Sequence, residues 1–134
     1  MNGDTYLSYD VQGFSDFHFS QSSDFSLVSI KMDVSSRFGN LDFNNKKVIK
    51  FNEKAQRTSG WINAGHYLIN SSLYSKFRLD CDFSGVNAFS IEKLMEQLAE
   101  NGKLYGYKVD TPFIDIGVPQ ALNVARNEFK WPKI

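Results

Sequence analysis

The 134-residue chain contains little cysteine, little proline and no excess of charge of either sign. Its single cysteine, Cys81, cannot form an internal disulfide, which excludes a disulfide scaffold and fits a reducing, cytoplasmic compartment. Fifteen basic and fifteen acidic residues cancel, which argues against a strongly basic nucleic-acid-binding protein. No apolar run approaches the ~20 residues of a membrane span, and no signal peptide is evident at the N-terminus. We therefore expect a cytoplasmic protein that binds neither nucleic acid nor membrane.

Hydrophobic residues make up 42% of the chain and aromatic residues 15%, enough to bury a core. Residues 1–134 contain no internal repeat and no obvious linker, so we expect a single domain. The first 24 residues lack clean periodicity, and we expect them to be irregular apart from one short helix near Gly13–Ser20.

Three segments have strand patterns. The nearly continuous apolar run Phe25–Met32 is typical of a strand covered on both faces. Arg37 to Phe51 alternates around Asn44-Asn45, which tolerate left-handed turn geometry and predict a hairpin. Gly60 to Ile69 predicts a further strand, followed by a turn.

Two helices follow in the second half. Residues 91–98 carry one apolar stripe, with Ser90 placed to cap the helix and Gly102 placed to close it. Strand material from Leu104 to Ile116 precedes a last helix, which has Pro119 in its first turn. Strands interleaved with helices predict an α/β fold.

Asp115 is the most informative polar residue, because it interrupts an apolar strand pattern just before a helix. A carboxylate there is costly unless its charge is compensated, and strand ends are where ligands bind in open α/β sheets. Two interpretations stay open from the residues alone. Asp115 either serves a binding site or accepts hydrogen bonds from backbone amides at the helix start.

Three other short motifs combine polar side chains with glycine or with paired charges. Asn2-Gly3-Asp4-Thr5 offers oxygen ligands for a hard cation, or it is a disordered terminus. Glu53-Lys54 suits sugar hydroxyls and a phosphate, or it belongs to a solvated loop. Asn63 and Gly65 share a strand face with Tyr67, and they offer a small polar ligand a side-chain amide and an exposed backbone. His66 falls on the opposite, apolar face, so we expect it to be a core histidine with satisfied hydrogen bonds.

Taken in order, these motifs resemble the second half of the sugar-1-phosphate nucleotidyltransferases, the family that includes mannose-1-phosphate and D-glycero-D-manno-heptose-1-phosphate guanylyltransferases. The segments that carry the resemblance are Asn2-Gly3-Asp4-Thr5, Phe38-Gly39, Val48-Ile49-Lys50-Phe51-Asn52-Glu53-Lys54, Ile62-Asn63-Ala64-Gly65-His66-Tyr67, Phe89-Ser90-Ile91-Glu92-Lys93 and Phe113-Ile114-Asp115-Ile116-Gly117-Val118-Pro119. The resemblance implies a partial Rossmann-like domain of the glycosyltransferase-A type, with a mixed sheet, flanking helices and its N-terminal half missing.

The resemblance also implies the chemistry. Members join a nucleoside triphosphate to a sugar 1-phosphate and release pyrophosphate, with Mg²⁺ as cofactor. Carried over by motif, Asp4 and Asp115 would hold Mg²⁺ and act in catalysis. The substrate-binding residues would be Gly39, Glu53, Lys54, Asn63 and Gly65, with Glu53 on the sugar hydroxyls and Lys54, also catalytic, on the sugar's phosphate.

The family's glycine-rich nucleotide loop is absent from this sequence. We therefore expect open strand edges and an open apolar face, which would favour self-association or a complementing N-terminal half. A guanylyltransferase half that works with another polypeptide is one hypothesis. An inactive remnant and a non-catalytic module that binds a sugar phosphate or a protein are the alternatives.

Overall fold

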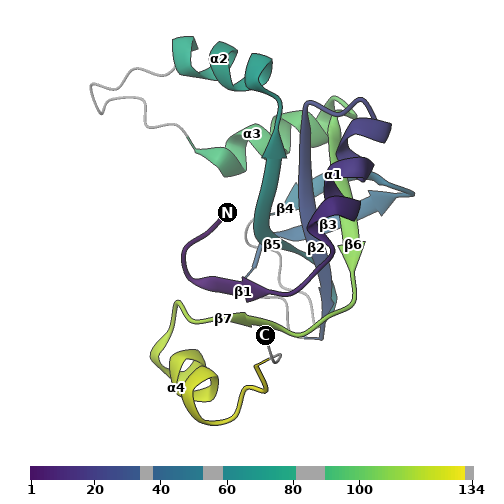
Figure 1. Ribbon diagram of the computed structural model, residues 1–134. Coiled ribbons are helices and arrows are strands. Elements are labelled where there is room, and N and C mark those ends of the chain that lie inside the picture. Colours follow the sequence, from purple (N-terminus) through teal and green to yellow (C-terminus); the bar gives the residue numbers. More distant parts are fainter. Residues whose placement is uncertain (34–37, 53–58, 81–89, 132–134) are drawn as a thin grey trace.

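The computed structural model describes residues 1–33, 38–52, 59–80 and 90–131, with the side chains of residues 77–80 left out of the description. Its strands form two sheets, which Figure 1 shows as a larger sheet in the middle and a short two-stranded ribbon below it. Among the described residues, no helix is long and apolar enough to cross a membrane.

The larger sheet closes into a barrel of five strands in the order β2-β5-β3-β4-β6. Its strands are β2 (Phe25–Met32), β3 (Asn40–Asn44), β4 (Lys47–Asn52), β5 (Gly60–Ile69) and β6 (Leu104–Val109). β2 pairs parallel with β6 and antiparallel with β5, so the predicted mixed sheet is confirmed. The prediction of open edges is wrong for this sheet, because each of its strands has a neighbour on both sides.

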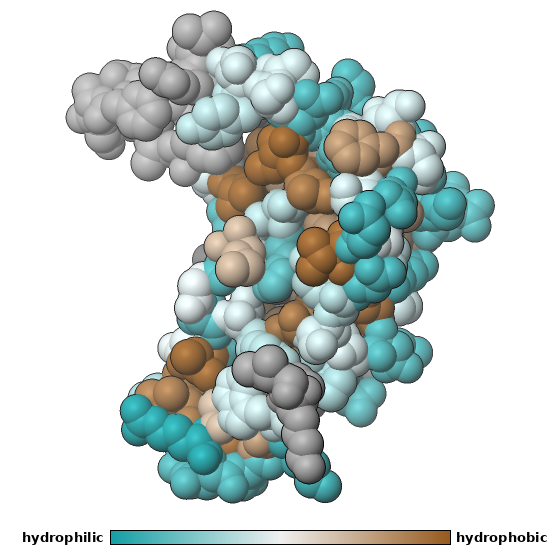
Figure 2. Space-filling view, viewed as in Figure 1, coloured by the Kyte–Doolittle hydropathy of each residue, from teal (hydrophilic) through white to brown (hydrophobic). Residues whose placement is uncertain are grey.

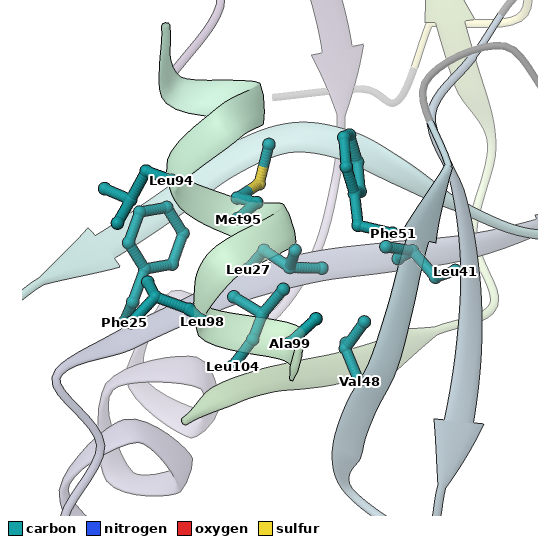
Figure 3. Packing of buried hydrophobic residues seen from close by; sticks show 10 residues of the cluster. All are labelled: Phe25, Leu27, Leu41, Val48, Phe51, Leu94, Met95, Leu98, Ala99 and Leu104. Carbon is teal, nitrogen blue, oxygen red and sulfur yellow. The ribbon is translucent and has the colours of Figure 1, made fainter. Parts of the chain in front are cut away.

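β2 lies between two clusters of buried apolar residues, because its side chains alternate between two covered faces. Helix α3 (Ile91–Glu100) covers one face, where the cluster in Figure 3 lies. Helix α1 (Val11–Ser20) and β1 (Thr5–Leu7) contribute to the cluster on the other face. The prediction that Phe25–Met32 is covered on both faces is confirmed: its first six residues are all buried.

The local signals that predict the hairpin and α3 are confirmed. Asn45 adopts a left-handed φ of 54° in the turn between β3 and β4. The hydroxyl of Ser90 accepts a hydrogen bond from the backbone N–H of Lys93 at 3.4 Å, as an N-cap does. Gly102 has a φ of 66° just past the end of the helix, the conformation in which glycine replaces a side chain at no steric cost.

Two elements differ from the sequence predictions. Helix α2 (Ser71–Asp80) occupies the segment expected to begin as a turn, and the Asn70 side chain accepts from the N–H of Ser72 at its start. β1 lies in the segment expected to be irregular. It pairs antiparallel with β7 (Phe113–Asp115), near the other end of the chain, and such a distant pairing leaves no local periodicity in so short a strand.

Helix α4 (Pro119–Asn127) follows β7 and lies beside the β1–β7 ribbon in Figure 1, away from α2. Among the described residues, β1 and β7 pair only with each other. The space-filling view in Figure 2 is hollowed on the side between the α4 end and the α2 end of the molecule. The N-terminal segment runs along this side in Figure 1, which places the Asn2–Thr5 motif at the hollow.

Candidate functional site

Asp4 and Asp115, which come from opposite ends of the sequence, are brought together by the β1–β7 ribbon. Asp115 lies opposite Thr5 in the antiparallel register. Next to this pair, the N–H of Ile116 donates to the carbonyl oxygen of Asp4 at 2.8 Å. The two strands therefore hold both aspartates at one end of the ribbon.

The two carboxylates converge at Gly117. A Cβ added to Gly117 would lie 3.1 Å from Oδ2 of Asp4 and 3.2 Å from Oδ1 of Asp115. The backbone N–H of Gly117 also donates to Oδ1 of Asp115 at 3.1 Å, which orients that carboxylate. The backbone-bonded interpretation of Asp115 is therefore confirmed, and the same side chain also lies beside a second carboxylate. The missing side chain at Gly117 leaves the space next to both oxygens clear.

This arrangement fits a divalent cation such as Mg²⁺. Carboxylate oxygens are its preferred protein ligands, and Mg²⁺ usually takes only one or two of them and completes its shell with water and substrate phosphates. Within the described ranges, no group of three or more His, Cys, Asp or Glu side chains is placed to hold a metal. The two aspartates match this coordination, since Asp4 is exposed and Asp115 is half-buried.

A bulge in β5 forms the second part of the site. Leu27 of β2 lies opposite Tyr67, whereas Ser29 lies opposite Asn63, so β5 has three residues between these partners where β2 has one. Gly65 lies within the bulge and has a φ of 77°, in the left-handed region that favours glycine. Bulges of this kind re-aim side chains next to binding sites.

Asn63 is held on three sides. Its backbone N–H donates to the carbonyl oxygen of Gly39 at 2.9 Å. Its side-chain oxygen accepts from the N–H of Gly65 at 3.0 Å, and its amide nitrogen donates to the hydroxyl of Tyr67 at 2.8 Å. The structure thus brings together Gly39, Asn63 and Gly65, the residues that the family resemblance assigns to one pocket.

Asn2 joins this bulge to the aspartate pair. Its backbone N–H donates to the carbonyl oxygen of Gly65 at 2.8 Å. Its side chain lies over Gly65, with Nδ2 at 2.7 Å from the position that a Cβ would take there. Since Asp4 follows two residues later, one short segment connects the predicted cation ligands to the bulge that carries the predicted sugar-binding residues.

Two neighbouring side chains have shifted pKa values. Burial raises the pKa of Tyr67. The hydrogen bond from Asn63 lowers this pKa in part, and the negative charge of Glu92 raises it slightly further. Burial lowers the pKa of His66, and the nearby N-terminal amine lowers it further. Nδ1 of His66 lies 3.1 Å from the Tyr9 hydroxyl. Nε2 is buried without a hydrogen-bond partner among the described residues, so the expectation of a satisfied core histidine is confirmed for one ring nitrogen only.

Glu53 and Lys54, the predicted ligands of the sugar hydroxyls and the phosphate, lie outside the described residues. Two residues of the site were not predicted as functional. Gly117 has no signal beyond its place after Asp115, because its role depends on a carboxylate from the other end of the chain. Tyr67 shares the predicted strand face of Asn63 and Gly65, and this alternation is the signal that links it to Asn63.

Comparison with known proteins agrees with this arrangement. The family model described as nucleotidyl transferase matches residues 1–130. A D-glycero-alpha-D-manno-heptose 1-phosphate guanylyltransferase of Aneurinibacillus thermoaerophilus is 30% identical over 97% of this chain and 54% of its own length. A mannose-1-phosphate guanyltransferase of Debaryomyces hansenii is 30% identical over 90% of this chain and 33% of its own length. The chain thus spans about half, or less, of the length of these relatives.

Solved structures show the same fold. The crystal structure of HddC from Yersinia pseudotuberculosis superposes with a TM-score of 0.71 at 25% identity. The match covers 97% of this chain and 54% of that protein. HddC has also been solved in complex with GMP-PN. The predicted α/β fold of the nucleotidyltransferase type is therefore confirmed.

Proposed function

The chain belongs to the nucleotidyl transferase family, and on that premise we propose that it is the sugar- and metal-binding half of a sugar-1-phosphate nucleotidyltransferase. The relatives named as heptose-1-phosphate and mannose-1-phosphate guanylyltransferases support guanylyl transfer to a sugar 1-phosphate. Because the matched region is about half of the heptose enzyme, we assign the nucleotide site to a segment outside these 134 residues.

The observation that carries the proposal is the continuity of the two half-sites. Asp4 and Asp115 converge at Gly117, and Asn2 joins them to the bulge at Gly65. A sugar 1-phosphate needs both halves, because its hydroxyls require hydrogen-bonding groups and its phosphate requires positive charge. The bulge supplies the first and the aspartate pair, by holding a cation, supplies the second.

The proposed roles follow from the chemistry of each group. Asp4 and Asp115 would hold Mg²⁺, which when bound neutralises phosphate charge. The Asn63 carboxamide can donate to and accept from sugar hydroxyls, while Gly39 and Gly65 let the ligand approach the backbone closely. Glu53 and Lys54 are proposed for the sugar hydroxyls and the phosphate.

In the proposed reaction, a phosphate oxygen of the sugar 1-phosphate attacks the α-phosphorus of the nucleoside triphosphate in line, and pyrophosphate leaves. No protein nucleophile is required, so this half contributes chiefly by holding the attacking phosphate in place. The rigid hold on Asn63 from Gly39, Gly65 and Tyr67 suits this task, since a positioning group must not lose its own orientation.

Ligand-observed NMR of the purified chain with mannose 1-phosphate tests the proposal. We expect saturable binding that is stronger with Mg²⁺ than without it. Asp115→Asn should remove the gain from Mg²⁺, whereas Asp110→Asn, at an exposed aspartate between β6 and β7, should keep it. A folded chain that shows no binding would contradict the proposal, as would an Mg²⁺ effect that survives in Asp115→Asn.

A further inference from the structure

We propose that Tyr67 is a positioning residue that fixes the orientation of the Asn63 carboxamide and thereby sets the affinity of the pocket for a sugar 1-phosphate. The proposal rests on the proposed function, because it concerns the same site. It adds a residue that does not itself need to contact the sugar. Its starting point is the 2.8 Å hydrogen bond from Nδ2 of Asn63 to the Tyr67 hydroxyl.

The carboxamide of Asn63 can face only one way. The backbone N–H of Gly65 is a donor, so the atom 3.0 Å from it must be the oxygen Oδ1 of Asn63. The nitrogen Nδ2 then points to the Tyr67 hydroxyl, which accepts from it. The two bonds leave one N–H and one oxygen lone pair of Asn63 in a defined direction for a ligand.

Tyr67 is itself well anchored. Its ring packs against that of Phe25, with centroids 5.7 Å apart, and against the apolar cluster beneath α3. The bulge at Gly65 brings this anchored hydroxyl within reach of Asn63, which a regular strand would place farther along the same face. Tyr67 therefore connects a flexible polar side chain to the rigid core.

The first turn of α3 also supports this arrangement. The Ser90 hydroxyl donates to Oε2 of Glu92 at 2.7 Å and holds that carboxylate near the helix start. Burial raises the pKa of Tyr67, the hydrogen bond from Asn63 lowers it in part, and the negative charge of Glu92 adds a smaller increase. This shift favours the protonated hydroxyl, the form present when Tyr67 accepts the hydrogen bond from Asn63.

A variant that loses the Tyr67 hydroxyl but keeps the aromatic ring isolates the contribution of the hydrogen bond to ligand affinity. In Tyr67→Phe, we expect the dissociation constant for mannose 1-phosphate to rise by about three- to tenfold, the usual size of one lost hydrogen bond. Tyr74→Phe removes a hydroxyl from an exposed tyrosine on α2 and should leave the dissociation constant unchanged. Asn63→Ala should weaken binding at least as much as Tyr67→Phe.

A double-mutant cycle distinguishes positioning from direct contact. If Tyr67 acts through Asn63, Tyr67→Phe should have no further effect in an Asn63→Ala background. Additive losses in the double variant would overturn the proposal, as would a single Tyr67→Phe variant that binds like the unsubstituted chain.

A second readout does not depend on the ligand. The two side-chain amide protons of Asn63 should give a pair of well-separated NMR signals, and Tyr67→Phe should shift the pair and speed its exchange with water. Unchanged Asn63 signals in Tyr67→Phe would overturn the proposal. If the unsubstituted chain binds no mannose 1-phosphate, the proposed function is wrong. The Asn63 amide signals then show by themselves whether Tyr67 orients Asn63.

Discussion

The carboxamide of Asn2 lies directly over Gly65, with Nδ2 at 2.7 Å from the place where a Cβ would be. The same two residues share a backbone hydrogen bond of 2.8 Å. This contact connects the segment that carries Asp4 to the bulge that carries Asn63. It depends on a glycine for two reasons, since Gly65 also has a φ of 77°.

Replacing Gly65 by alanine should therefore strain the backbone and displace Asn2. We expect Gly65→Ala to lower the free energy of unfolding by about 1–3 kcal/mol, from the cost of a left-handed non-glycine residue and the crowding of Asn2. Urea denaturation measures this loss. Gly3→Ala is the matched control, because a Cβ at Gly3 meets nothing within 4 Å. Equal stability of the two variants would contradict this role of Gly65.

Gly117 should matter for the cation rather than for stability. A Cβ there would lie 3.1 and 3.2 Å from the two carboxylate oxygens, so it would occupy the space beside both. Gly117→Ala is expected to weaken Mn²⁺ binding, used as a spectroscopic probe of the Mg²⁺ site, by about tenfold or more.

The free energy of unfolding of Gly117→Ala should remain within about 0.5–1 kcal/mol of the original, because carboxylate side chains can move aside. Titration of Mn²⁺ by electron paramagnetic resonance, beside urea denaturation, separates the two effects. Unaltered Mn²⁺ affinity in Gly117→Ala would show that the aspartate pair does not hold the ion in this space.

The buried histidine His66 predicts a loss of stability in mild acid. Burial lowers its pKa in the folded chain, so below about pH 6.5 the unfolded chain binds a proton that the folded chain does not. The free energy of unfolding should be fully maintained above that pH and fall as the pH decreases toward the lower, folded pKa. His66→Leu should show a smaller decrease.

His18 has a pKa lowered by burial and partly restored by Asp24, and it contributes to the pH dependence in the same direction. His18 is present in the original chain and in His66→Leu. The difference between their pH-dependent free energies of unfolding therefore reports on His66 alone. Urea denaturation at several pH values provides the comparison. Parallel pH profiles would mean that His66 does not couple protonation to folding.

The cluster beneath α3 should supply much of the stability. Met95 has no exposed surface and lies between Leu94 and Phe51 in the view of Figure 3. Met95→Ala should cost about 2–5 kcal/mol, from lost apolar burial and the cavity left behind. Val124→Ala, at a half-exposed position on α4, should change stability by no more than about 0.5 kcal/mol. Similar losses in the two variants would place the main core elsewhere.

The elements that could be predicted from sequence are those with local signals. α3 has an apolar stripe, a capping serine and a closing glycine within one short segment, and β2 has a nearly continuous apolar run. β1 and its pairing with β7 could not be predicted, because three residues carry no usable periodicity and their partner is distant in sequence.

The candidate site likewise combines residues that the sequence indicates with contacts that it does not indicate. The motif order pointed to Asp4, Asp115, Asn63 and Gly65, and alternation placed Tyr67 on the face of Asn63. The contacts that join these residues depend on tertiary structure: Asn2 over Gly65, both carboxylates at Gly117, and a bulge that changes the register of β5. A regular-strand interpretation contains none of them, because the two extra residues in β5 leave the alternation of side chains, which has a period of two, unchanged.

The most direct test of the central claim is nucleotide-sugar formation by a chimera in which the remaining half of a guanylyltransferase relative precedes this chain. With GTP, Mg²⁺ and mannose 1-phosphate or heptose 1-phosphate, we predict release of pyrophosphate together with a GDP-sugar. Asp115→Asn should reduce the rate by about a hundredfold or more, whereas Asp110→Asn should preserve it. A folded chimera that forms no nucleotide sugar, or one whose rate is unaffected by Asp115→Asn, would contradict the account.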